Sequence, residues 1–175
     1  AGIEALRTGG NAVDAALAAA ITLTVVEPNN NGVGSDAFAL LWDGEKLAGL
    51  NASGRAPQGV DLNKFAGRGQ IPPLGWDAVT VPGAVSAWVA LSERYGKLAF
   101  ADLFKAAIHY AERGFQVGPK TAFYWQLASK TYSGLPNFAE HFLPAPKAGE
   151  LFRRPDLAVT LRKIADSRGA AFYTG

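Results

Sequence analysis

A run of small residues between Ala12 and Ala20 is the feature that most limits what this chain can fold into. Six of these nine residues are alanine, the residue with the highest helix propensity. Small side chains on every side of a helix let other elements approach closely, so we predict a buried helix here. Asn11 is expected to be its N-cap, with Asp14 in the capping-box position. The β-branched stretch 21–26 follows, and Pro28 ends it.

Composition agrees with a globular protein and excludes several classes of function. Apolar residues make up 49% of the 175 residues and charged residues 18%, which excludes intrinsic disorder. The net charge of +2 is too small to predict nucleic acid or an anionic membrane as a partner. The chain has no cysteine, which excludes disulfides, thiolate metal sites and a cysteine nucleophile. The longest apolar run, between Asp14 and Glu27, is too short to span a bilayer.

The length suits one domain or a large piece of one, and we treat residues 1–175 as a single domain segment. The chain has no methionine, and its first residues have the composition of the middle of a helix. We therefore expect the segment to be cut from a longer polypeptide.

Strand and helix patterns predict a mixed architecture. Two apolar runs, 37–42 and 46–50, predict a hairpin with a two-residue turn at Asp43-Gly44. The continuous apolar character of the first run predicts a sheet covered on both faces. Residues 51–76 are predicted as loop and 77–81 as a short strand. Further helices are expected over 84–95, 101–113, 121–130 and 156–167, with an irregular stretch before the last one.

The loop 51–57 is the best candidate for binding chemistry that the residues alone provide. It follows a predicted strand, and Arg55 offers a planar cationic fork that suits a carboxylate. Asn51 and Ser53 add short polar groups beside it. The alternative interpretation is a solvated arginine on a loop, and at this level both remain open.

Other candidates are weaker. His109 and His141 belong to no metal-ligand or triad spacing, so we interpret both as structural. The Gly32–Gly34 loop lacks the third glycine of a dinucleotide loop and is followed by a predicted strand, which argues against nucleotide binding.

A series of short motifs, taken in chain order, resembles the gamma-glutamyltranspeptidase family over nearly the whole chain. The motifs are Gly9–Ala16, Val26–Pro28, Gly32–Gly34, Val81–Gly83, Tyr95–Leu98 with Gly114–Val117, Phe152–Leu157 and Phe172–Gly175. The resemblance implies an α+β fold, the αββα sandwich of the N-terminal nucleophile (Ntn) hydrolases. This segment would form part of that sandwich, and the rest of a precursor would complete it.

Members of this family cut themselves into a large and a small subunit, and the small subunit begins with a catalytic threonine. The resemblance implies transfer or hydrolysis of γ-glutamyl amides such as glutathione. The segment matches only the first part of the large subunit, so it should be inactive alone, and neither Thr160 nor Thr174 is the nucleophile. The implied partners are the small subunit and a small γ-glutamyl substrate, without nucleic acid or membrane. No cofactor or metal is implied.

The family's substrate-binding arginine precedes an Ala-Pro pair and grips the substrate α-carboxylate. Counted back from Ala56-Pro57, its usual position falls on Ser53, whereas the loop's arginine is Arg55. This departure resembles a divergent branch that includes cephalosporin (glutaryl) acylases. We predict Arg55 as the carboxylate contact, with Ser53 and Asn51 as further contacts. The alternative for Arg55 is a structural ion pair with Glu27 or Asp36.

Three functional hypotheses therefore stay open: γ-glutamyl transfer or hydrolysis, glutaryl acylase activity, and a non-catalytic relative. For the compartment we favour the cytoplasm, with the periplasm or the medium as alternatives.

Overall fold

The computed structural model describes the backbone of residues 1–175 and every side chain except that of Leu62. The chain divides into two compact units, one of Ala1–Gly32 with Val89–Gly175 and one of Val33–Trp88. Helices dominate the first unit and a hairpin with long loops makes up most of the second, so the chain has the predicted α+β character. The assignment of the whole segment to one domain stays a prediction.

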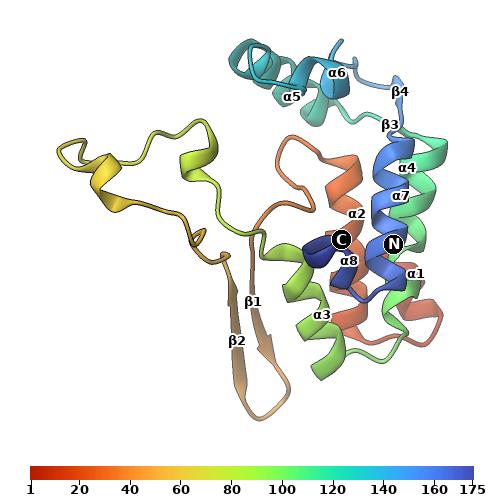
Figure 1. Ribbon diagram of the computed structural model, residues 1–175. Coiled ribbons are helices and arrows are strands. Elements are labelled where there is room, and N and C mark those ends of the chain that lie inside the picture. The colour runs from red at the N-terminus through yellow and green to blue at the C-terminus, as the bar shows by residue number, and fades with distance from the viewer. The chain divides into compact units, whose positions relative to one another are not determined.

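The larger unit is a layered group of helices. It contains α1 (Gly2–Arg7), α2 (Ala12–Val26), η3 (Phe100–Phe104), α4 (Lys105–Arg113), α5 (Pro119–Tyr132), α6 (Phe138–Phe142), α7 (Pro155–Asp166) and α8 (Ala170–Thr174). Helix α3 (Ala84–Tyr95) runs from the smaller unit into this one. Figure 1 shows α2, α4 and α7 side by side, and α2 also packs against α1 and η3.

Helix α2 is buried, as its small side chains predict. Leu17, Ile21 and Val25 are almost fully shielded from solvent. So are Leu103 and Phe104 of η3, which packs against α2, and Leu161 and Ile164 of α7, which packs against η3 and α4. The helix continues through the β-branched stretch to Val26. It can do so because the hydroxyls of Thr22 and Thr24 donate to the carbonyls of Ala18 and Ile21, both at 2.7 Å. Their polar atoms are thereby satisfied inside the core.

The predicted capping box at the start of α2 is confirmed. Asn11 Oδ1 accepts hydrogen bonds from the N–H groups of Val13 and Asp14, at 2.9 and 3.0 Å. In return, Asp14 Oδ2 accepts the Asn11 N–H at 2.8 Å. Three of the four donors that every helix start leaves unpaired are satisfied in this way.

The Asp14 carboxylate also joins two distant parts of the chain. It is fully buried, and it accepts the backbone N–H groups of Lys97 and Leu98 at 3.0 and 3.3 Å. Asn11 Nδ2 adds a bond to the Tyr95 carbonyl at 2.6 Å. Gly96 lies so close that an added Cβ would sit 2.9 Å from Asp14 Oδ1. One buried carboxylate therefore links the start of α2 to the end of α3.

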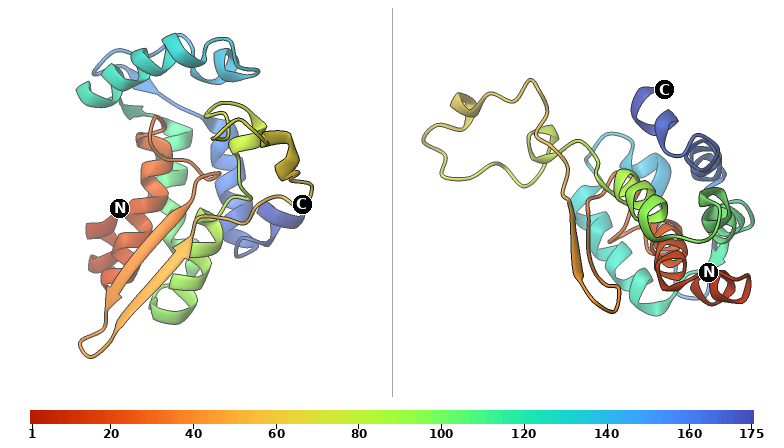
Figure 2. Two further views of the ribbon diagram at one scale, coloured as in Figure 1. Left: turned by 90° about the vertical axis from the view of Figure 1, so that its left-hand side faces the viewer. Right: turned by 90° about the horizontal axis from the view of Figure 1, so that it is seen from below.

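Helices α5 and α6 are attached to the rest of the larger unit through a short ladder and an aromatic cluster. Strand β3 (Phe115–Gln116) pairs antiparallel with β4 (Leu151–Phe152). The Trp125 ring lies 4.6 Å from the Phe152 ring, and Trp125 Nε1 donates to the Phe142 carbonyl at 2.9 Å. The prediction of an irregular stretch before the last helix is therefore wrong in part, since it contains α6 and β4. Figure 2 shows α5 and α6 next to this ladder.

The smaller unit is built on a two-stranded hairpin. Strand β1 (Ala37–Trp42) pairs antiparallel with β2 (Leu47–Ala52), with Ala37 opposite Ala52 and Trp42 opposite Leu47. The predicted two-residue turn is wrong, because the connection has four residues, 43–46. Asp43 Oδ1 accepts the N–H groups of Glu45 and Lys46 at 2.9 and 2.8 Å, and this side-chain bonding sets the longer turn.

Within the described chain, one face of the hairpin stays exposed, and the predicted cover on both faces, which the rest of a precursor would supply, stays a prediction. Burial alternates along β1, and Phe38, Leu40 and Trp42 are 65%, 80% and 64% exposed. The predicted strand 77–81 is also wrong, since the 3-10 helix η2 (Trp76–Ala78) begins just before it. A second 3-10 helix, η1 (Leu62–Phe65), lies in the loop region.

The remaining helix predictions are confirmed within a few residues. The predicted helices 84–95, 121–130 and 156–167 correspond to α3, α5 and α7, while 101–113 begins as η3 and continues as α4. Among the described residues, no helix is both long and apolar enough to cross a membrane.

We predict that Asp14→Ala lowers the free energy of unfolding of the complete protein by about 3 kcal/mol, because three backbone donors lose their buried acceptor. Chemical denaturation measures this, or thermal midpoints if unfolding is irreversible. Asp102→Ala is the control: Asp102 is 44% exposed and pairs only with Lys105, so its loss should cost less than about 1 kcal/mol. Equal losses in the two variants would contradict the assignment.

Candidate functional site

The predicted binding loop begins at the last residues of β2. Asn51 Oδ1 accepts the backbone N–H of Ser53 at 3.0 Å, which turns the chain sharply out of the strand. All three predicted site residues, Asn51, Ser53 and Arg55, lie on this one loop. Asn51 uses its side-chain oxygen in the turn, so its amide NH₂ is the group it can still offer to a ligand.

The segment Thr80–Val81 fixes the backbone of this loop. Thr80 Oγ1 donates to the Ser53 carbonyl at 3.0 Å, and the Val81 N–H donates to the Arg55 carbonyl at 2.9 Å. Gly54 has a φ of +85°, and an added Cβ would lie 2.0 Å from the Val81 carbonyl oxygen. Only glycine fits this position, so Ser53 and Arg55 are held on either side of a rigid turn.

A second close approach joins this loop to the glycine loop before β1. An added Cβ at Gly83 would lie 1.9 Å from the Ala52 carbonyl oxygen. The N–H groups of Gly83 and Ala84 both donate to the Ser35 carbonyl, at 3.1 and 2.9 Å. Sequence reasoning missed Thr80 and Ser35 as supports, and the Pro82-Gly83 pair that interrupts the apolar run was the available signal.

The Arg55 side chain is exposed, and it forms no ion pair or hydrogen bond with any described side chain of its own unit. The structure therefore does not show the ion pair between Arg55 and Asp36 that the alternative interpretation expected in this unit. In the larger unit, the Glu27 carboxylate accepts the side-chain amides of Asn30 and Asn31, at 3.3 and 2.9 Å. A guanidinium without such a partner, attached to a fixed backbone, can donate two parallel hydrogen bonds to a carboxylate.

Among the described residues, Arg55 is the candidate anion contact of this loop. His109 is exposed, contrary to the expected partial burial, and His141 is half-buried; the neighbouring rings of Tyr110 and Phe142 have centroids 5.9 Å and 6.5 Å away. Across the described side chains, no group of three or more histidine, aspartate or glutamate residues is arranged to hold a metal ion.

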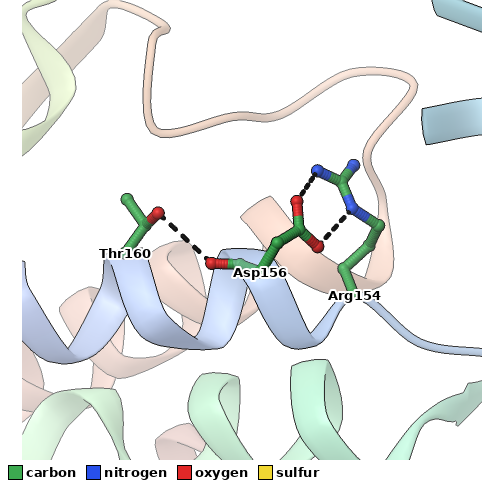
Figure 3. Close-up of polar contacts among 3 residues, drawn as sticks. All are labelled: Arg154, Asp156 and Thr160. Carbon is green, nitrogen blue, oxygen red and sulfur yellow. Dashed lines mark hydrogen bonds and ion pairs between the residues drawn. The ribbon is translucent and has the colours of Figure 1, made fainter. Parts of the chain in front are cut away.

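Another polar pair lies at the start of α7, shown in Figure 3. Arg154 Nε and Nη2 donate to the two carboxylate oxygens of Asp156, at 2.9 and 2.5 Å. These hydrogen bonds lower the pKa of Asp156 from 3.8 to about 2, against a smaller opposing effect of burial. The guanidinium carbon also lies 5.2 Å from the Phe142 ring centroid. Because its cation is already paired, we interpret this pair as a support for the start of α7 and not as a substrate site.

Comparison with known proteins places the chain in one family. The family model described as Gamma-glutamyltranspeptidase matches residues 1–175. The Glutathione hydrolase-like YwrD proenzyme of Bacillus subtilis is 38% identical, over 100% of this chain and 34% of the relative. The chain thus spans about a third of the length of the curated relatives it matches.

Two solved structures share the fold. The cephalosporin acylase from Bacillus halodurans is 45% identical with a TM-score of 0.92, over 99% of this chain and 35% of that one. The gamma-glutamyltranspeptidase from Pseudomonas nitroreducens, complexed with L-DON, is 36% identical with a TM-score of 0.91, over 99% of this chain and 53% of that one. These likenesses confirm the predicted α+β Ntn-hydrolase fold.

We predict that the Arg154–Asp156 pair stabilises the complete protein at neutral pH and loses this effect in acid. The folded-state pKa of Asp156 is depressed, so its contribution is present above the unfolded pKa near 3.8 and is lost as pH falls through about 2. Since Asp156 is 53% exposed, solvent screening limits the contribution to about 1 kcal/mol.

Thermal unfolding of Asp156→Asn and of the parent protein, compared at pH 7 and at the lowest pH where both stay folded, measures this contribution. The difference in midpoint should shrink toward low pH. A difference that grows in acid would show that the carboxylate contributes in some other way.

Proposed function

The chain belongs to the gamma-glutamyltranspeptidase family, and we propose that it is the first part of the large subunit of an autoprocessed enzyme that cleaves γ-glutamyl amides. The observation that carries this proposal is Arg55, an unpaired guanidinium on a glycine-fixed loop at the end of β2. A γ-glutamyl group has a free α-carboxylate, and such a charge-assisted contact contributes about 1.5–3 kcal/mol.

The reaction itself needs groups outside this segment. A threonine that begins the small subunit would attack the γ-amide carbon through its hydroxyl, with its own α-amino group taking the hydroxyl proton. The amide C–N bond would then break, and the departing amine would leave with that proton. The acyl-enzyme would then pass the γ-glutamyl group to water in hydrolysis or to an amine in transpeptidation. In this proposal, Arg55 binds the α-carboxylate of the glutamyl group and orients the group for attack.

The exposed face of the hairpin supports the proposal that another part of the same precursor packs against it. Phe38, Leu40 and Trp42 project from one face of β1, and Leu47 adjoins them in β2 with 66% exposure. Large apolar side chains gathered on a strand face are typical of a surface that another layer covers. We propose that the rest of the precursor, including the small subunit, covers this face and completes the sandwich.

A second candidate activity is hydrolysis of glutaryl amides. The 45% identity to a cephalosporin acylase favours it, as does the arginine at position 55 where the usual family pattern puts it at position 53. A glutaryl group keeps the distal carboxylate and lacks the α-amino group. Both candidates therefore use Arg55 in the same way, and they differ in whether the site also binds an ammonium group.

Expression of the complete precursor tests the proposal. We expect two subunits on a denaturing gel and release of the aniline from γ-glutamyl-p-nitroanilide. Glutaryl-p-nitroanilide, assayed alongside, separates the two activities through the ratio of kcat/KM. An uncleaved precursor that releases neither product would identify a non-catalytic relative instead.

We predict that Arg55→Ala raises KM for the γ-glutamyl anilide at least about tenfold, since a charge-assisted hydrogen bond is lost. The KM of Arg55→Lys should fall between those of the parent protein and Arg55→Ala, because an ammonium keeps the charge but not the planar fork. Arg68→Ala removes another exposed arginine of the same unit and should leave KM unchanged. If KM stays the same in Arg55→Ala, Arg55 has no role in substrate binding.

A further inference from the structure

A small pocket lies between the end of α2 and helices α5 and α6, all within the larger unit. Its volume is about 120 Å³, and its lining includes Asn29, Trp125, Ala128, Tyr132, Phe138 and Phe142. This size is close to that of cavities of about 150 Å³ that admit a benzene ring. The pocket is therefore large enough for a single aromatic ring.

The aromatic residues of the pocket form a continuous wall. The ring centroids of Trp125 and Phe142 lie 6.0 Å apart, those of Phe142 and Phe138 5.3 Å, and those of Phe138 and Tyr132 5.9 Å. The Trp125 indole N–H donates a hydrogen bond to the Phe142 carbonyl, and this bond fixes the indole in place. The wall thus presents ring faces and edges, which favour an aromatic ligand.

Asn29 provides the polar group of the pocket. Its side-chain Oδ1 and Nδ2 are both buried, and neither has a hydrogen-bond partner. Its two neighbours behave differently, since Asn30 and Asn31 both donate to the Glu27 carboxylate. Buried amide groups are almost always paired, so an unpaired one that lines a ring-sized pocket indicates a ligand that supplies both a donor and an acceptor.

The lining indicates a ligand without net charge, because none of the described lining residues has a charged side chain. A carboxylate or an ammonium group would be buried there without a counter-ion, at a large desolvation cost. A pure hydrocarbon would leave the Asn29 amide unpaired. A neutral amide matches both atoms of Asn29, because it accepts through its carbonyl and donates through its N–H.

We propose that this pocket binds a small neutral aromatic amide, with the ring against the Trp125–Phe142–Phe138 wall and the amide group paired with Asn29. The inference uses only residues of the larger unit. It does not depend on the proposed amidase activity, and its failure leaves that activity untouched.

Calorimetric titration of benzamide into the complete protein tests the proposal, with toluene as the ring that lacks an amide. We expect benzamide to bind about tenfold more tightly than toluene, as the pairing of one buried amide implies. In Asn29→Leu this preference should disappear. Asn30→Ala, at the exposed neighbouring asparagine, is the matched control and should keep it.

A second variant tests the place of binding without touching Asn29. Ala128→Leu fills the pocket from α5 and should abolish benzamide binding, whereas Ala139→Leu on the exposed side of α6 should not. Failure of benzamide to bind the complete protein overturns the proposal, as does binding that survives both Asn29→Leu and Ala128→Leu. A crystal structure with a side chain from the rest of the protein in the pocket would overturn it too.

Discussion

The buried carboxylate of Asp14 is the interaction on which the larger unit depends. It lies at the first turn of α2, where negative charge is favoured by the helix dipole, and it forms no ion pair with any cationic side chain that the structure describes. Backbone N–H groups from Asn11, Lys97 and Leu98 solvate it instead of water. Because a buried charge without such donors is very costly, these segments must meet in one geometry. Helices α1, η3 and α4 pack directly against this α2, and α7 packs in turn against η3 and α4.

This bonding explains motifs that carry the family resemblance without taking part in its chemistry. The motif around Asn11 and Asp14 and the motif 95–98 are far apart in sequence but share one hydrogen-bond network. The Pro82-Gly83 motif meets the Ser35 carbonyl in the same way, inside the smaller unit. Much of the recognisable sequence is therefore needed to bring loops together.

Local signals were sufficient for the parts of the fold that local bonding determines. The Asn11 cap, the alanine-rich helix and most helix bounds follow from short-range propensity, and the structure has them. The short β3–β4 ladder and α6 could not be predicted, because the contact of Trp125 with Phe152 stabilises them across the sequence. The cover of the hairpin faces is a separate case, because a continuous apolar run does not reveal which part of the polypeptide covers it. At the candidate site, the sequence predicts Arg55, Ser53 and Asn51 as contacts, and this role stays a prediction, whereas the sequence did not reveal the supporting Thr80.

The position of the arginine has a simple structural meaning on this loop. Ser53 and Arg55 flank Gly54, and the carbonyls of both are bonded to the Thr80–Val81 segment. A cation can therefore move from position 53 to position 55 without any change in the backbone that supports it. On our proposal that Arg55 binds the substrate carboxylate, what changes is the point from which the guanidinium reaches, and so the length and shape of the acyl group that fits. A rigid loop with a relocated charge is a direct way for one fold to serve acyl groups that share a carboxylate but differ elsewhere.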